Sequence, residues 1–136
     1  MTSDARGVEW QEWPVCSFKS IGPNCARGFH AGEGDWPFRG FVVRRDDRVF
    51  AYANICPHRR HPLDSMPDQF LVEDGRLIRC GSHGALFTSE TGECVFGPCV
   101  GDQLMRLCVR VDEQGDVLVR CPDNLQEAIS LAQAGR

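Results

Sequence analysis

The stretch NICPHRRHPLD, residues 54–64, places a cysteine and a histidine two positions apart in a chain that has only four histidines. A second stretch, CGSHGALF at residues 80–87, repeats the combination in the form Cys-x-x-His. Thiolates and imidazoles are preferred ligands of zinc and iron in proteins. The two mixed pairs therefore predict one metal centre with four ligands: Cys56, His58, Cys80 and His83.

Two kinds of centre suit this ligand set. A structural zinc ion would take all four side chains, although its ligands usually come as a Cys-x-x-Cys pair and a separate histidine pair. A Rieske [2Fe–2S] cluster instead has two cysteines on one iron and two histidines on the other. In that arrangement each loop supplies one ligand to each iron, which is what two mixed pairs offer. Zinc stays the alternative.

Composition and charge exclude several classes of partner. The net charge of −4 is unlike that of an electrostatic nucleic-acid binder, which needs a clustered basic face. No apolar run approaches the ~20 residues that cross a bilayer. Residues 1–10 lack the apolar core of a secretory signal, so we expect a cytoplasmic protein with no membrane or nucleic-acid partner. In that reducing compartment the eight cysteines are expected to bind metal or be buried, not to form disulfides.

Apolar runs separated by turn residues predict an all-β fold of stacked antiparallel sheets, sandwich-like or barrel-like. Four hairpins are expected, turning at Asp46-Asp47, Asp74-Gly75, Thr91-Gly92 and Gln114-Gly115. Residues 21–40 are rich in glycine and proline and read as a loop. After Pro122 the apolar spacing becomes helical, which predicts a short C-terminal helix.

The two boxes CPHRRHPLD and CGSHGALF, together with TGECVFGP at residues 91–98, resemble the two ligand boxes and the proline-bearing third loop of the Rieske family. The resemblance spans about residues 10–121 and implies a Rieske [2Fe–2S] domain, followed by a helical tail at 122–136. It also implies that the two cysteines bind one iron and the two histidines the other. One departure is the interval 59–79 between the boxes, which is longer than in typical small Rieske carriers.

Among Rieske proteins the chain resembles the stand-alone ferredoxins. That resemblance implies a one-electron carrier with no catalytic residues of its own. It would accept electrons from a flavin-dependent reductase and deliver them to a terminal oxygenase or a related multicomponent enzyme. Two alternatives stay open: an accessory subunit of a reductase, such as the small subunit of an assimilatory nitrite reductase, and a redox-sensing or zinc-binding interaction module.

The boxes also indicate the reduction potential. High-potential Rieske proteins have a disulfide between the loops, at positions that match His61 and Ser82, and hydroxyl donors at positions that match Ala85 and Phe87. A hydrogen bond to a charged group is worth about 1.5–3 kcal/mol, and about 1.4 kcal/mol corresponds to roughly 59 mV. Because this chain lacks both the disulfide and the hydroxyl donors, we expect a reduction potential near the low end of the family range, about −150 mV.

The other candidate side chains receive structural interpretations. His30 is expected to be a solvated or hydrogen-bonded side chain, not a ligand, and Arg45 part of a solvated strand end. The cysteines outside the boxes are expected to be small buried apolar residues. They are Cys16, Cys25, Cys94, Cys99, Cys108 and Cys121.

Overall fold

The computed structural model describes residues 2–3, 9–31, 38–55, 63, 70–80, 84–97 and 100–122. The regular structure in these residues is β-strand, apart from one short 3₁₀ turn, η1 (Phe18–Ser20). The strands are β1 (Thr2–Ser3), β2 (Glu9–Ser17), β3 (Ala26–Ala31), β4 (Phe38–Arg45), β5 (Arg48–Ala53), β6 (Leu71–Val72), β7 (Leu77–Arg79), β8 (Leu86–Thr88), β9 (Cys94–Phe96), β10 (Arg106–Val111) and β11 (Asp116–Pro122).

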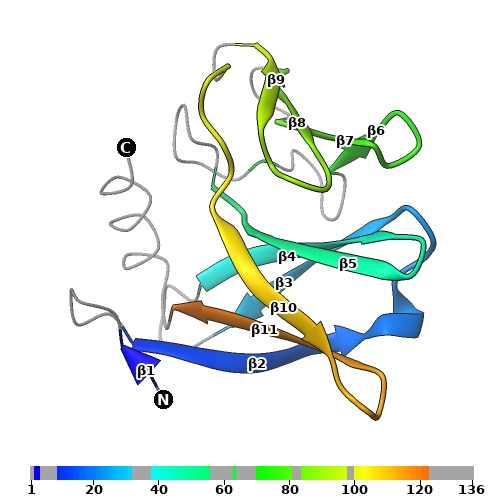
Figure 1. Cartoon of the computed structure of the whole chain (residues 1–136), viewed down its shortest axis with the longest axis vertical. Coiled ribbons are helices and arrows are strands. Elements are labelled where there is room, and N and C mark those ends of the chain that lie inside the picture. Colours follow the sequence, from blue (N-terminus) through cyan, green and yellow to red (C-terminus); the bar gives the residue numbers. More distant parts are fainter. Residues whose placement is uncertain are drawn as a thin grey trace.

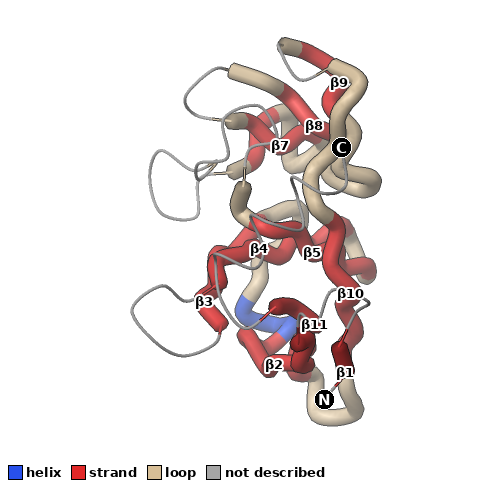
Figure 2. Tube along the Cα trace, turned by 90° about the vertical axis from the view of Figure 1, so that its left-hand side faces the viewer, coloured by secondary structure: helices blue, strands red, loops and turns tan. Residues whose placement is uncertain are grey.

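The strands form two antiparallel sheets. The larger sheet has the order β1-β2-β11-β10-β5-β4-β3, and the smaller has the order β6-β7-β8-β9. Figure 1 shows the small sheet at one end of the molecule, with β4 and β5 between it and strands β2 and β11. The view turned by 90° in Figure 2 keeps β7–β9 and the N-terminal strands at opposite ends. The predicted all-β fold of antiparallel sheets is confirmed.

Strands β4 and β5 are buried on both faces, which explains the continuous apolar run in their sequence. On one face the paired residues Phe41 and Tyr52 pack towards the small sheet. On the other face Val42 and Ala51, also paired, join a second cluster inside the large sheet. Alternation places successive side chains on opposite faces, so a strand between two clusters must be apolar throughout.

Hydrogen bonds tie the small sheet to the large one. The Tyr52 hydroxyl donates to the Ser89 carbonyl oxygen at 2.7 Å, and the Ser89 hydroxyl donates to the Gly75 carbonyl oxygen. Burial raises the pKa of Tyr52 to about 12, so the phenol stays a neutral donor. Arg45, expected to be solvated, is half-buried, and its Nη1 donates to the Asp74 carbonyl oxygen at 2.9 Å. That prediction was wrong because the turn after β6 folds back onto β4.

All four predicted hairpins form, and the first has a two-residue turn at Asp46-Asp47, since Arg45 pairs with Arg48 across it. In the second hairpin Val72 pairs with Leu77, so the connection has four residues. In the third, the Gly92 amide donates to the Thr88 carbonyl oxygen at 2.8 Å within a longer loop. Hydrogen bonds stabilise these longer loops: Arg45 of β4 donates to the loop after β6, and the Asp112 carboxylate accepts two backbone amides in the last loop. The dipeptides that predict a turn do not show such partners.

The interpretation of residues 21–40 as a loop was wrong, because β3 occupies Ala26–Ala31 and pairs with β4. The strand is at the edge of the large sheet, and only Phe29 and Ala31 are buried on it. Its exposed residues and Gly28 interrupt the alternation of apolar and polar residues that would predict a strand. The predicted C-terminal helix lies outside the described residues. In the part of the chain that is described, no helix is long and apolar enough to cross a membrane.

Candidate metal centre

The first box leaves the large sheet where β5 ends. The next two residues, Asn54 and Ile55, are buried, and the Asn54 amide donates to the Arg39 carbonyl oxygen at 3.0 Å. The Asn54 side-chain oxygen accepts the amide of Leu63 at 2.6 Å. This bond joins the two ends of the segment that contains Cys56 and His58. Those two predicted ligands themselves lie outside the described residues.

We expect Asn54→Ala to loosen this segment. The substitution leaves the Leu63 amide without its acceptor in a buried place, which costs about 1–3 kcal/mol. The check is the melting temperature of the iron-loaded protein and its rate of iron loss to a chelator at constant temperature. Ser20→Ala is the matched control, since it removes an exposed side-chain bond to the Ser17 carbonyl oxygen. Equal behaviour of the two variants would contradict the role of Asn54.

The second box forms a closed loop between β7 and β8. Cys80 follows β7 and is completely buried. Its amide donates to the Ala85 carbonyl oxygen at 2.9 Å, and its own carbonyl oxygen accepts the Gly84 amide at 2.9 Å. Gly84 has φ +69°, a conformation that favours glycine. The predicted ligand His83 precedes Gly84 in the sequence and lies outside the described residues.

The third loop packs directly on the second box. Gly97 has φ +99°, and a Cβ atom on it would lie 2.9 Å from the Cα atom of Ala85. Such a separation is shorter than real Cβ contacts, so only glycine lets the two backbones approach this closely. The third loop therefore contacts the second box at Gly97, while Pro98 lies outside the described residues.

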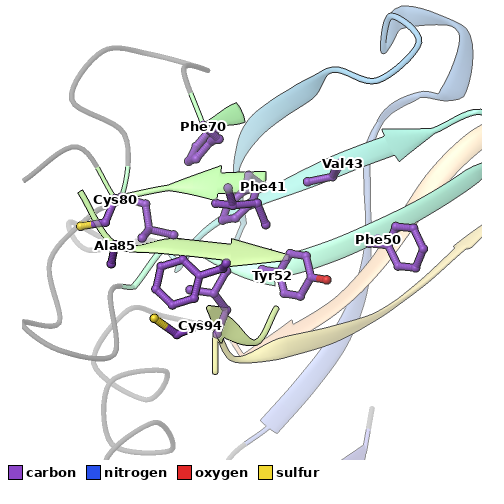
Figure 3. Close-up of a cluster of buried hydrophobic side chains, with 12 residues drawn as sticks. Phe41, Val43, Phe50, Tyr52, Phe70, Cys80, Ala85 and Cys94 are labelled. Atoms are coloured by element: carbon purple, nitrogen blue, oxygen red, sulfur yellow. The ribbon is translucent and has the colours of Figure 1, made fainter. Parts of the chain in front are cut away.

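The three loops meet in one apolar cluster between the sheets. Leu63 from the first box, Cys80 and Ala85 from the second, and Cys94 before the third loop all belong to it. Figure 3 shows the Cys80 sulfur at the end of this cluster that is far from Phe50. If Cys80 is ionised in this apolar position, its thiolate needs a positive partner, which a metal centre would supply. Cys80 is the one predicted ligand that the structure describes, its position is compatible with a metal centre, and the ligand roles of Cys56, His58, Cys80 and His83 all stay predictions.

A family model supports the same conclusion from the whole sequence. The model of the Rieske [2Fe-2S] domain matches residues 11–122. The chain belongs to the Rieske [2Fe-2S] domain family. The cofactor of this family is a [2Fe–2S] cluster, so the Rieske centre is confirmed over the zinc alternative.

Several solved Rieske structures are similar to this chain. The ferredoxin of carbazole 1,9a-dioxygenase from Nocardioides aromaticivorans IC177 is 26% identical, with a TM-score of 0.63 over 80% of this chain and 96% of that one. A complex of reduced oxygenase and oxidised ferredoxin in carbazole 1,9a-dioxygenase matches at 25% identity, with a TM-score of 0.62 over 83% and 94%. Sphingomonas yanoikuyae B1 ferredoxin, 22% identical, shares the fold with a TM-score of 0.62 over 82% and 100%. No curated protein sequence matches.

The remaining candidate side chains have varied surroundings. His30 is exposed on β3, and its Nε2 accepts a hydrogen bond from Arg39 Nε at 3.2 Å, so the side chain is hydrogen-bonded as expected, in a strand instead of a loop. Among the other cysteines, Cys94 and Cys121 are buried as expected, and Cys99 lies outside the described residues. Cys25 and Cys108 are exposed, which corrects the expectation for those two. Burial raises the pKa of the half-buried Cys16 thiol.

Proposed function

We propose that this chain is a soluble, cytoplasmic Rieske-type ferredoxin. It takes one electron at a time from a flavin-dependent reductase and passes it to a terminal oxygenase. The observation that carries the proposal is the packing of the two ligand boxes and the third loop in one buried cluster that includes Cys80. The similar ferredoxin of a carbazole dioxygenase, and the complex of such a ferredoxin with its oxygenase, support the choice of acceptor.

In this proposal the residues of the chain hold and shield the centre. Cys56 and Cys80 would bind one iron, and His58 and His83 the other. When bound, the cluster supplies a site that takes up and releases one electron. Ala85 and Phe87, both completely buried, exclude water around Cys80 and offer no hydroxyl to it. The short bonds that close the second box keep Cys80 in one position, so little reorganisation accompanies the change of charge.

The decisive experiment combines spectroscopy with reconstitution. Anaerobically purified protein should contain two irons per chain and, after dithionite reduction, show the rhombic EPR signal of a Rieske centre. It should then complete electron flow from a flavin-dependent reductase to a terminal Rieske oxygenase of the source organism. A normal EPR signal without transfer to any such oxygenase would reject the carrier role and favour an accessory subunit of another reductase. One zinc per chain and no EPR signal would reject the centre itself.

The reduction potential tests the surroundings of the centre. We expect about −150 mV for the wild-type protein. Ala85→Ser introduces a hydroxyl next to the closed loop of Cys80 and should raise the potential by roughly 50 mV, because a donor to a charged group stabilises the reduced form. Ala51→Ser is the matched control, since Ala51 is equally buried but belongs to the other apolar cluster. Equal potentials in the two variants, measured by EPR-monitored titration, would contradict this prediction.

A further inference from the structure

An exposed apolar patch adjoins the third loop. The described residues expose four large apolar side chains, and three of them lie close together in sequence on β9 and just after it. Val95 is 51% exposed, Phe96 63% and Val100 65%. The fourth, Val111, is at the end of β10 and 39% exposed. Single exposed apolar residues are ordinary, but a group of them indicates a binding surface. We call Val95, Phe96 and Val100 the β9 patch.

The pairing of the small sheet places a positive charge beside the β9 patch. Arg79, Leu86 and Phe96 are direct partners across β7, β8 and β9, so their side chains lie on one face of the sheet. The alternate partners Ile78 and Phe87 are buried on the opposite face. Arg79 is exposed, and its guanidinium makes no ion pair with any residue that the structure describes.

This face adjoins the two loops that surround the centre. Arg79 directly precedes Cys80, and Phe96 directly precedes Gly97, which packs on Ala85. The strand β9 is also the edge of its sheet, at the end of the molecule far from the N-terminal strands (Figure 2). A protein that binds here would therefore lie against the second box and the third loop.

The size and charge of this face indicate what binds to it. A patch of this size suits a transient complex, since electron-transfer encounters bury less than about 1,200 Å² in total. A second copy of the chain is disfavoured where the two-fold axis passes through this face, because such a contact would bring the Arg79 side chains of the two copies near each other. An acceptor with an apolar depression beside a carboxylate would satisfy both parts of the face.

We propose that the β9 patch and Arg79 together form the surface that docks the terminal oxygenase. The proposal rests on the proposed function and adds the residues that recognise the acceptor and the chemistry they require of it. Phe96 supplies the apolar anchor, and Arg79 supplies the charge that orients the encounter. Apolar anchors of this kind usually dominate the lifetime of a complex, whereas charges at its rim set the association rate.

The test compares two variants with two matched controls. Phe96→Ser and Arg79→Glu alter the proposed surface, while Val111→Ser and Arg27→Glu introduce the same residues at exposed positions on β10 and β3. The measured quantity is the second-order rate constant for oxidation of the reduced protein by a terminal Rieske oxygenase of the source organism. We expect each surface variant to lose about tenfold and the controls to match the wild-type protein. Arg79→Glu should also remove the decrease of the rate with ionic strength.

Two further measurements separate the outcomes. Oxidation by a neutral quinone reports the driving force without docking, so the rate of each variant with an oxygenase is compared with the rate of the same variant with the quinone. If an oxygenase oxidises all variants at equal rates, the docking surface is wrong and the carrier function stands. If no oxygenase oxidises even the wild-type protein, the proposed function fails and the docking surface fails with it. A dimer in sedimentation that Phe96→Ser dissociates would assign the patch to a second copy and overturn the proposal.

Discussion

Replacing Cys80 by serine should yield a protein without a cluster. Cys80 is the predicted ligand that the structure places in the apolar cluster, where a serine hydroxyl, much less acidic than a thiol, is a poor replacement for a thiolate on iron. The variant should have neither the visible absorption nor the reduced-state EPR signal of the wild-type protein. Its melting temperature should also fall, because a ligand bound to the folded state alone contributes to stability.

The chain offers close controls for this variant. Cys25 and Cys108 are exposed, so serine at either position should leave the iron content and the EPR signal unchanged. Cys94→Ser is more informative, because Cys94 is buried in the same apolar cluster as Cys80 without being a predicted ligand. It should lower the melting temperature and retain two irons. Retention of the cluster in Cys80→Ser with absorption and EPR spectra identical to those of the wild-type protein would show that another side chain is the ligand.

Replacing Gly97 by alanine should have the second-largest effect. The new Cβ atom would lie 2.9 Å from the Cα atom of Ala85, and φ +99° is unfavourable for any L-residue. Backbone strain of this kind costs about 1–3 kcal/mol, and the steric overlap adds a similar amount. We expect the melting temperature of the iron-loaded protein to fall by about 10 °C and iron loss to a chelator to accelerate.

Gly101 separates the two contributions to this effect. It has φ +102°, almost the same as Gly97, but a Cβ atom there would meet nothing within 4 Å. Gly101→Ala should therefore show the strain alone, about half of the decrease in melting temperature. The difference between the variants measures the contact between the third loop and the second box. If both variants melt at the same temperature, that contact does not stabilise the site.

The parts of the structure that the sequence predicted are local. The hairpins follow from alternating apolar residues and turn residues that are neighbours in the chain, and the two boxes follow from the spacing of cysteine and histidine. The errors arise where residues that are distant in the sequence determine the hydrogen bonds and burial of a side chain. Asn54 accepts a hydrogen bond from a residue nine positions away, and Arg45 donates to one 29 positions away. Neither partner can be chosen from spacing alone.

Edge strands were the other source of error. Strand β3 is paired on one side only, and Arg27 and His30 on it are exposed. The strand therefore has too few apolar residues to show a clear alternation in the sequence. For the site, Gly97 was predicted to belong to the loop that covers the centre. Its contact with Ala85 could not be predicted without the three-dimensional structure.

The small sheet has strands of only two or three residues, whereas strands of the large sheet reach nine. With so few hydrogen bonds between its strands, the small sheet has little stability of its own. Local unfolding requires the least free energy where such bonds are few. In protein without iron we expect amide hydrogens of β6–β9 to exchange with deuterium sooner than those of β4 and β5. The large sheet would then fold first and serve as a scaffold during maturation, with the small sheet open to cluster-delivery proteins until iron arrives.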